Sequence, residues 1–349
     1  MTYKIRIADA DIDREREGIF SVLAENFPGL PQERYEWIYK GNPQGKTVRI
    51  IAYYSGERPI GTLTLFPRRI YANGEPLNCA ITGDFCVNAK HRVFGPALAL
   101  QRTAVQQCES GKFDLLYGIP NQQSRKVQLR AGFEELGKVL RLTKPLKSQY
   151  YIARRVRNKI LLRLLSFVAD SVLEMASREN FRMNSGGFSV LKPEVFDNEF
   201  DRLWNSVRKD RMVIGERSSA YLNWRFRQCP HGKYNIFAIM SSQDGITSYL
   251  VYKVEGRKVS ISDLLAKDMH NGMDTLLSQF LQYLRGIDVE AVSISFLENK
   301  LLLKKLKKFG FSQRHCEDDV LVYVPYRLRN YLDLVEKGKW YILAGDNDI

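Results

Sequence analysis

One pattern of residues occurs twice in this chain, and the duplication limits its fold more than any other feature. The two copies are YEWIYKGNP, which starts at Tyr35, and YLNWRFRQCP, which starts at Tyr221. In both, a tryptophan is followed by an aromatic residue two positions later and by a proline six positions later. Because a pattern repeated at a long spacing indicates repeated units of structure, we predict two related halves.

The same elements then follow in the same order in each half. Two apolar segments, residues 48–70 and 234–254, each predict a β-hairpin, with SGE or SQDG as its turn. Each hairpin is followed by an apolar strand that contains Asp84 or Asp263, and then by a helical stretch, a strand, a second helix and a Gly-Phe pair. A matched order of this length is hard to obtain by chance, so we interpret the two halves as a duplication.

Strands that alternate with helices in this way are typical of sheets covered by helices. We therefore predict an α/β (α+β) fold with two tandem domains, each a mixed central sheet flanked by helices. The first domain is expected over residues 1–144 and the second, which ends in a C-terminal tail, over residues 185–349. The chain is long enough for each domain to bury its own core.

Residues 145–184, between the two domains, are predicted to form a basic amphipathic helix. Apolar residues recur there every four positions: Ile152, Val156, Ile160, Leu164, Val168 and Val172. Arginines and lysines lie between them, which leaves two roles open. The helix can connect the domains and pack its apolar stripe on them, or residues 145–170 can contact an anionic membrane.

The formal net charge of +14 raises the question of nucleic-acid binding. Much of this charge comes from one local stripe, since residues 136–169 contain many lysines and arginines and no acidic residue. No sequence motif of a nucleic-acid-binding fold accompanies the stripe. We therefore do not expect a nucleic acid as a partner.

The cysteines and histidines argue for a reducing compartment and against a metal centre. The five cysteines are scattered and the four histidines lie far apart, so neither a disulfide framework nor a metal site is expected. The charged N-terminus does not resemble a secretory signal, and no apolar run approaches the length of a membrane span. A cytoplasmic location is predicted.

The run DFCVNAKHRVFGPA, from Asp84 to Ala97, combines the end of a strand, a short loop and the start of a helix. Unpaired N–H groups and the helix dipole attract a phosphate group at such a helix start. Gly95 allows a pyrophosphate to approach the backbone closely, small Ala97 leaves room beside it, and Arg92 can add a charge-assisted contact. Pro96 suits a first helical turn but removes one N–H donor.

This run resembles the acyl-CoA signature of the GNAT acyltransferases, Q/R-x-x-G-x-G/A, and the segment GIPNQQSRKVQLRAGF resembles the strand, asparagine, helix and Gly-Phe pair that follow it in that family. The resemblance implies that the domains are GNAT-like and that acetyl-CoA or another acyl-CoA is the cofactor. The residues that it assigns to cofactor binding are Val87, Arg92, Val93, Phe94, Gly95, Ala97, Asn121 and Ser124.

The second half departs from this signature. When it is aligned on Asp263, its three signature positions hold Asn271, Asp274 and Leu276. An acidic side chain repels a pyrophosphate, and a bulky leucine crowds the phosphate-binding loop. We predict a degenerate second domain that shapes the acceptor site or stabilises the first domain.

Nearly the whole chain resembles the tandem GNAT proteins associated with bacterial surface-polysaccharide synthesis. The motifs that carry this resemblance are Y-x-W-x-Y-x3-P, PN-x2-S, R-x3-YL-x-WRF from Arg217 and WYILAGDND from Trp340. The resemblance implies acyl transfer to the amine of a sugar or cell-envelope precursor, either a small molecule or linked to a lipid. It also allows a peripheral position at the inner face of the membrane.

In that family, catalysis consists mainly of positioning the thioester beside the amine. A strand N–H near Val87 can stabilise the tetrahedral oxyanion that forms. The tyrosine that usually reprotonates the thiolate is replaced here by Gln128, so the usual acid is absent. Asp84 and His91 are the local candidates for the catalytic base. Their alternatives are a structural cap or ion pair for Asp84 and a solvated loop position for His91.

Four residues are candidates for binding the acceptor. Trp37 and Tyr39 can stack on a sugar ring, although their duplication favours core packing. Asp346 and Asp348, in the C-terminal tail, can receive an ammonium group or act as a base, and a disordered acidic end is the alternative.

Two other functions remain open. A Fem-type aminoacyl-tRNA-dependent transferase is also a tandem GNAT fold, but it does not need the acyl-CoA loop. A non-catalytic adaptor for envelope assembly or the membrane surface is favoured by the missing tyrosine and by Pro96.

Overall fold

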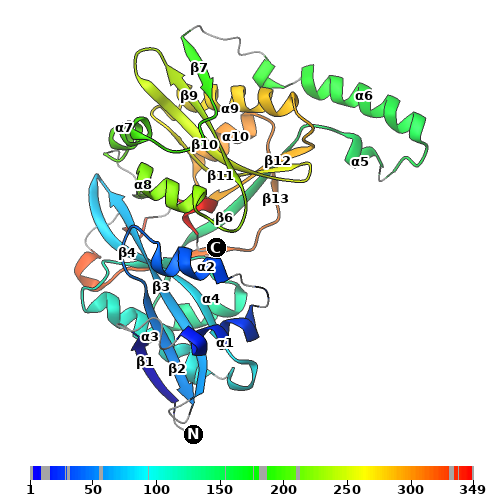
Figure 1. Ribbon diagram of the computed structural model, residues 1–349. Helices are drawn as coiled ribbons and strands as arrows, with labels where there is room; N and C mark the ends of the chain where they lie inside the picture. Colours follow the sequence, from blue (N-terminus) through cyan, green and yellow to red (C-terminus); the bar gives the residue numbers. More distant parts are fainter. Residues whose placement is uncertain are drawn as a thin grey trace.

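The computed structural model describes residues 3–8, 16–27, 29, 32–54, 58–92, 94–153, 155–175, 177–180, 187–209, 213–329, 334–336 and 338–347. Two bodies of strands and helices lie one above the other, and the C-terminus lies between them (Figure 1). The predicted α/β fold, a mixed sheet flanked by helices, is confirmed. No helix within the described ranges is long and apolar enough to cross a bilayer.

The first body is a sheet whose strands follow one another along the chain. The strands are β1 (Tyr3–Ala8), β2 (Val48–Tyr54), β3 (Arg58–Ala72), β4 (Glu75–Val87) and β5 (Leu116–Gly118). The helices are α1 (Arg16–Asn26), α2 (Gln32–Tyr35), α3 (Phe94–Glu109) and α4 (Gln122–Arg130). The first four strands pair antiparallel in chain order, which confirms the predicted hairpin over residues 48–70, and β5 joins β4 in parallel.

The second body has the same order of elements. Its strands are β7 (Phe188–Leu191), β9 (Tyr234–Ser241), β10 (Gly245–Glu255), β11 (Lys258–Ala266) and β12 (Ala291–Leu297). Its helices are α7 (Asn198–Val207), α8 (Ser219–Leu222), α9 (Asn271–Arg285) and α10 (Lys300–Lys308). The hairpin predicted over residues 234–254 is confirmed by β9 and β10, and β12 joins β11 in parallel as β5 joins β4.

An exchange of strands joins the two bodies into one continuous sheet. β14 (Asp319–Tyr323), which comes from the second half, lies between β5 and β6 (Glu134–Pro145). β6 also pairs with β12 and with β13 (Ser312–Arg314). A single apolar core therefore includes residues of both bodies, and the predicted boundary at residue 144 falls within a strand that they share.

Short elements complete the structure. Two short strands, β8 (Val213–Gly215) and β15 (Trp340–Tyr341), extend the sheet from β3. The 3-10 turns are Ala89–His91, Arg178–Asn180, Tyr326–Leu328 and Ala344–Asp346. The π-turns are Glu36–Lys40 and Asn223–Arg227. Each copy of the duplicated tryptophan motif forms a short helix, α2 or α8, that continues into one of the two π-turns.

The linker contains two separate helices, α5 (Gln149–Ala153) and α6 (Lys159–Met175), where the sequence suggested one. The second helix begins where Asn158 accepts hydrogen bonds from the backbone N–H groups of Ile160 and Leu161, which caps it. The predicted apolar stripe does not pack on either body, because its members on α6 are strongly exposed. Of the two roles considered for the linker, the prediction that this stripe packs on the domains is therefore wrong.

Candidate active site

The strand–loop–helix run predicted to bind phosphate connects β4 to α3. β4 ends at Val87, one 3-10 turn covers Ala89–His91, and α3 starts at Phe94. Gly95 is exposed in the first turn of α3, and a side chain at its position would meet nothing closer than a carbon of Tyr3 at 3.9 Å. The space above this helix start is therefore open to a ligand.

Arg92 closes the loop on one side. Its Nε donates a hydrogen bond of 3.0 Å to the Val87 carbonyl, and its Nη2 donates one of 2.9 Å to Oδ1 of Asn26 in α1. The guanidinium thus stays at the mouth of the loop, beside the end of β4. A cation held there, with further N–H groups on its guanidinium, suits a negatively charged ligand group.

A cavity of about 330 Å³ lies between this loop and α4. Its lining residues are Asn26, Phe27, Phe85, Cys86, Val87, Arg92, Ala97, Asn121, Gln123, Ser124 and Val127. Five of the predicted cofactor residues are thus brought together: Val87, Arg92, Ala97, Asn121 and Ser124. Val93 and the side chain of Phe94 lie outside the part of the chain that the structure describes.

Asn121 has a structural role in addition to lining the cavity. Its Oδ1 accepts a hydrogen bond of 2.9 Å from the Ser124 backbone N–H and so caps α4. The cap fixes the side chain at the edge of the cavity. Asn26, Phe27 and Gln123 escaped the sequence reasoning because they belong to no signature, and only the packing of α1 and α4 brings them to this cavity.

β4 and β5 separate beside the cavity. They pair in parallel only at Ala80 with Leu116 and at Ile81 with Tyr117, after which β4 continues to Val87 without β5. At the last point of contact, a Cβ on Gly118 would lie 2.4 Å from Thr82 Oγ1, so a glycine is required there. An unpaired strand edge of this kind offers backbone groups to an extended ligand.

Gln128, at the position of the expected tyrosine, points to this separation. The side chain is buried, and its Nε2 donates a hydrogen bond of 3.1 Å to Thr82 Oγ1. Its Oε1 has no hydrogen-bond partner among the described residues. A neutral amide cannot act as a proton donor in the way that a phenol can.

Asp84, one candidate base, is held in a buried ion pair. Arg34 donates to both of its carboxylate oxygens at 2.9 Å, and the Tyr39 hydroxyl donates a further short hydrogen bond. The backbone of Asp84 has a φ of +47°, at an irregular point in the β3–β4 pairing, so this residue is held in a strained conformation. Taking up a proton would break the bidentate pair, and the geometry therefore favours the structural alternative.

Tyr39 and Trp37, predicted to stack on a sugar, are both buried. Burial, together with the neighbouring Asp84, raises the pKa of Tyr39, so its hydroxyl stays protonated and donates. Trp37 stacks on Trp224 with ring centroids 5.1 Å apart. Each indole N–H donates to the other tryptophan's carbonyl, at 2.7 and 3.0 Å, so the pair joins the two bodies and does not face a ligand.

His91, the second candidate base, does not line the cavity. Its ring contacts Tyr54, with centroids 4.9 Å apart, and meets the edge of Tyr3 at 6.4 Å. The residue is half-buried beside these two tyrosines. This position agrees with the solvated loop alternative.

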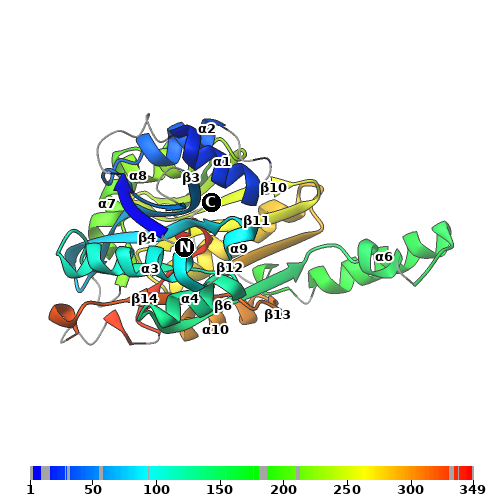
Figure 2. The ribbon, with the colours of Figure 1, turned by 90° about the horizontal axis from the view of Figure 1, so that it is seen from below.

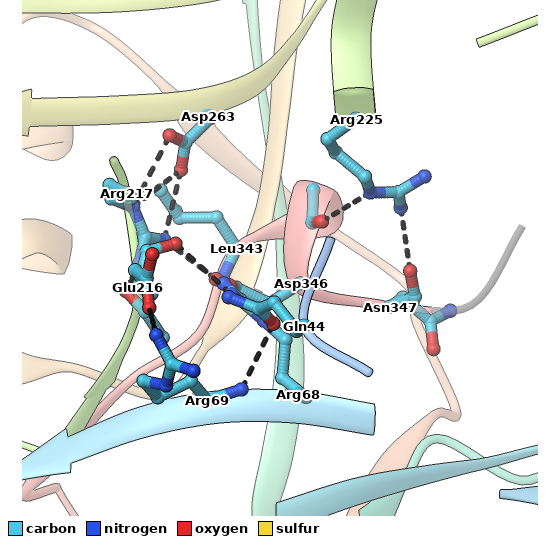
Figure 3. A network of polar contacts seen from close by, with 12 residues as sticks. Gln44, Arg68, Arg69, Glu216, Arg217, Arg225, Asp263, Leu343, Asp346 and Asn347 are labelled. Atoms are coloured by element: carbon cyan, nitrogen blue, oxygen red, sulfur yellow. Dashed lines mark hydrogen bonds and ion pairs between the residues drawn. The ribbon is translucent and has the colours of Figure 1, made fainter. Parts of the chain in front are cut away.

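Asp346 lies in a buried network of ion pairs and not in an open tail (Figure 3). Its carboxylate accepts hydrogen bonds from Arg68 at 2.7 Å and from Arg217 at 2.6 Å, and Arg217 also pairs with Asp263 at 2.9 Å. Burial alone would raise the pKa of Asp346, but Arg217 and Arg68 outweigh it and hold the pKa below its ordinary value. Asp348 lies outside the described residues.

The network fixes the C-terminal segment over the end of β5. The Tyr117 hydroxyl in β5 donates to the Asp346 carbonyl at 3.1 Å. Arg225 donates to the carbonyls of Gly345 at 2.8 Å and Asn347 at 2.6 Å. Residues of both bodies therefore hold this segment in place.

A second cavity, of about 510 Å³, lies under the C-terminal segment. Its lining residues are Ile119, Val139, Arg141, Ser295, Phe296, Leu297, His315, Cys316, Glu317, Asp318, Ile342, Leu343, Ala344 and Asn347. The connection from β5 to α4 contributes to both cavities, since Ile119 lines the second and Asn121 the first. The second is apolar where buried and carries charged groups at its rim.

Comparison with known proteins agrees with this geometry. Residues 9–135 match the model of the acetyltransferase (GNAT) domain family. A probable N-acyltransferase from Enterococcus faecalis V583 is 13% identical, with a TM-score of 0.67 over 93% of this chain and 72% of that one. A GCN5-related N-acetyltransferase from Anabaena variabilis ATCC 29413 is 14% identical, with a TM-score of 0.65 over 92% and 73%. No curated protein matches.

At such low identity, the solved structures show that the fold is shared. The family match covers β2 to β5 and the three helices that contribute residues to the first cavity, α1, α3 and α4. Together these findings support an enzyme of the acyltransferase class.

Proposed function

We propose that the protein is an acyl-CoA-dependent N-acyltransferase made of two tandem GNAT-like units, residues 1–144 and 185–349, of which only the first binds the cofactor. The observation that carries the proposal is the first cavity, which gathers five cofactor-type residues around an open helix start. An acyl-CoA would supply the activated acyl group. Arg92 and the N–H groups of α3 would hold its phosphates, and Asn121 and Ser124 would face its arm.

The matching position in the second body supports a single cofactor site. Asp274, in the first turn of α9, is buried and forms a short ion pair with Lys305 of α10. Leu276 is fully buried in the core. A helix start filled by its own ion pair has no space for a pyrophosphate.

The second cavity is the proposed site of the acceptor amine. It borders the separation of β4 and β5 through Ile119, so an amine there can approach the acyl group from the side opposite the cofactor. Glu317 and Asp318 at the rim suit a substrate that arrives as an ammonium ion. The attacking nitrogen must lose this proton, and because Asp84 is ion-paired, water or the rim carboxylates would accept it.

The acceptor class is proposed from the sequence motifs shared with polysaccharide-associated tandem GNAT proteins. It is the amine of a sugar or cell-envelope precursor, either free or linked to a lipid. An enzyme of such a pathway would work in the cytoplasm, with peripheral contact to the inner face of an anionic membrane through residues 145–170.

Calorimetry with acetyl-CoA tests the cofactor site. We expect the wild-type protein to bind and Gly95→Glu to lose binding, because a carboxylate would enter the phosphate position. Gly272→Glu is the matched control, since Gly272 lies in the first turn of α9 and has room for a side chain. Absence of binding by the wild type would remove the proposal in favour of a non-catalytic adaptor or a transferase that uses aminoacyl-tRNA. Equal binding by Gly95→Glu would show that the site is misplaced.

A further inference from the structure

Helix α6 extends away from both bodies of the protein, as the two views in Figures 1 and 2 show. Eight of its apolar side chains are between 42% and 75% exposed. They are Ile160, Leu161, Leu164, Leu165, Phe167, Val168, Val172 and Met175. Exposed apolar residues are normal when they occur singly, but a contiguous set of this size marks a surface that binds something.

The polarity of α6 is inverted relative to an ordinary surface helix. Ser166 is buried, and its carbonyl accepts a hydrogen bond of 3.3 Å from the Ser148 hydroxyl. Asp170 accepts one of 2.6 Å from the Ser148 backbone N–H. The middle of the polar side thus faces the segment just before α5, and the apolar side faces outward, the reverse of what a helix packed on a core presents.

The apolar side covers more than half of the circumference. Lys159, Arg163, Ser166, Asp170 and Glu174 follow one another at steps of three or four residues and so form a single narrow polar stripe. The rest of the circumference is almost entirely apolar. A second helix would cover only a narrow seam of such a surface, whereas the interfacial region of a bilayer can cover all of it at once.

The charge around the helix is complementary to an anionic bilayer. Arg155, Arg157, Lys159 and Arg163 are exposed at or just before its N-terminal end. Basic residues near a bilayer surface are attracted to anionic headgroups. The 17 residues of α6 are too few to span a bilayer while its charged residues stay outside the hydrocarbon region. The helix would therefore lie in the plane of the membrane.

We propose that the apolar side of α6 inserts into the interfacial region of an anionic membrane, with the four basic residues at its N-terminal end on the lipid headgroups. This deepens the proposed contact of residues 145–170 and rests on that part of the proposed function alone. Acyl-CoA binding uses a different part of the molecule, so either proposal can fail without the other.

Co-sedimentation of the full-length protein with phosphatidylcholine vesicles, with and without 30% phosphatidylglycerol, tests the proposal. We expect binding to the anionic vesicles to weaken as salt is raised. Replacing Arg157, Lys159 and Arg163 with glutamine removes three charges and should reduce partitioning by roughly a hundredfold. Leu164→Glu with Val168→Glu should abolish it.

Two matched controls keep the test specific. Val195→Glu with Val254→Glu makes the same chemical change at exposed apolar positions of the second body and should bind vesicles like the wild type. Phe167→Trp should show a blue shift in emission with anionic vesicles, whereas Tyr326→Trp should not; the four native tryptophans are buried. Acetyl-CoA binding should be unchanged in all these variants.

Several results would overturn the proposal. One is a wild-type protein that does not bind anionic vesicles. Another is an α6 variant that binds as well as the wild type. A third is sedimentation of the lipid-free protein as a dimer that Leu164→Glu with Val168→Glu dissociates, without vesicle binding, which would assign the apolar side to a second copy of the chain.

Discussion

Replacing Asp346 with asparagine should destabilise the protein by about 3 kcal/mol, at the lower end of the ~3–5 kcal/mol expected when one partner of a buried ion pair is removed. Asp346 accepts hydrogen bonds from two arginines, Arg68 and Arg217, whose side chains are 1% exposed. Arg217 would keep Asp263, but Arg68 would keep no carboxylate within ion-pair distance among the described residues. We expect the lower value because one of the two arginines, Arg217, keeps a carboxylate partner.

Urea unfolding at pH 7, followed by tryptophan fluorescence, measures the change, because the four tryptophans are buried and occur in both bodies. Asp288→Asn is the control, since it removes a carboxylate that also meets two cations, Lys147 and Arg257, both at 2.7 Å. Asp288 is 69% exposed, so its loss should cost no more than about 1 kcal/mol. If the two variants lost the same free energy of unfolding, the ion-pair network would not be what holds the C-terminal segment.

Three further predictions concern pH, the cofactor and the acceptor. Because the folded-state pKa of Asp346 is depressed, its stabilising contribution is present above the ordinary aspartate value of 3.8 and is lost as pH falls through the folded pKa. The difference in unfolding free energy between the wild type and Asp346→Asn should therefore shrink between pH 6 and pH 3, and a constant difference would contradict this. Asn121→Ala should weaken acetyl-CoA binding measured by calorimetry and also cost about 1 kcal/mol of stability through the lost cap, whereas Gln122→Ala beside it should do neither. Glu317→Gln should raise the KM for the amine acceptor in steady-state assays and leave the acetyl-CoA affinity unchanged, and a change in cofactor affinity alone would show that the second cavity is not the acceptor site.

The strand, loop and helix start proposed to bind the cofactor were predictable from sequence because they are local. The end of β4, the turn and the start of α3 lie within the run from Asp84 to Ala97, and neighbouring residues determine such a connection. The repeated order of strands was predictable for the same reason, since each hairpin and each helix has its own pattern. The five predicted residues of the first cavity all come from β4, this loop, the first turn of α3 and the capped start of α4.

The second cavity was not predictable, because residues far apart in sequence form it. Ile119, Arg141, Phe296, Glu317 and Asn347 approach one another only after β6 and β14 exchange between the bodies. No local pattern specifies that exchange, since antiparallel strands with similar apolar residues can pair in several orders.

The buried position of Asp346 in the C-terminal segment was not predictable for a related reason. An acidic end beside a chain terminus suggests exposure, and only the fold reveals that two arginines from distant strands and turns surround Asp346.

These contacts give the two bodies unequal parts in the proposed transfer reaction. At the matching helix start the second body has the ion pair of Asp274 and Lys305, and it also supplies two groups that hold the C-terminal segment, Arg217 and Arg225. That segment is tied to β5 of the first body through Tyr117 and covers the cavity beside the point where β4 and β5 separate. In the proposed function, the second body would contribute to transfer without binding the cofactor, because it builds one wall of the cavity proposed for the amine. On this argument, variants of Arg225 should impair acceptor turnover more than acetyl-CoA binding, although Arg225 belongs to the half proposed to bind no cofactor.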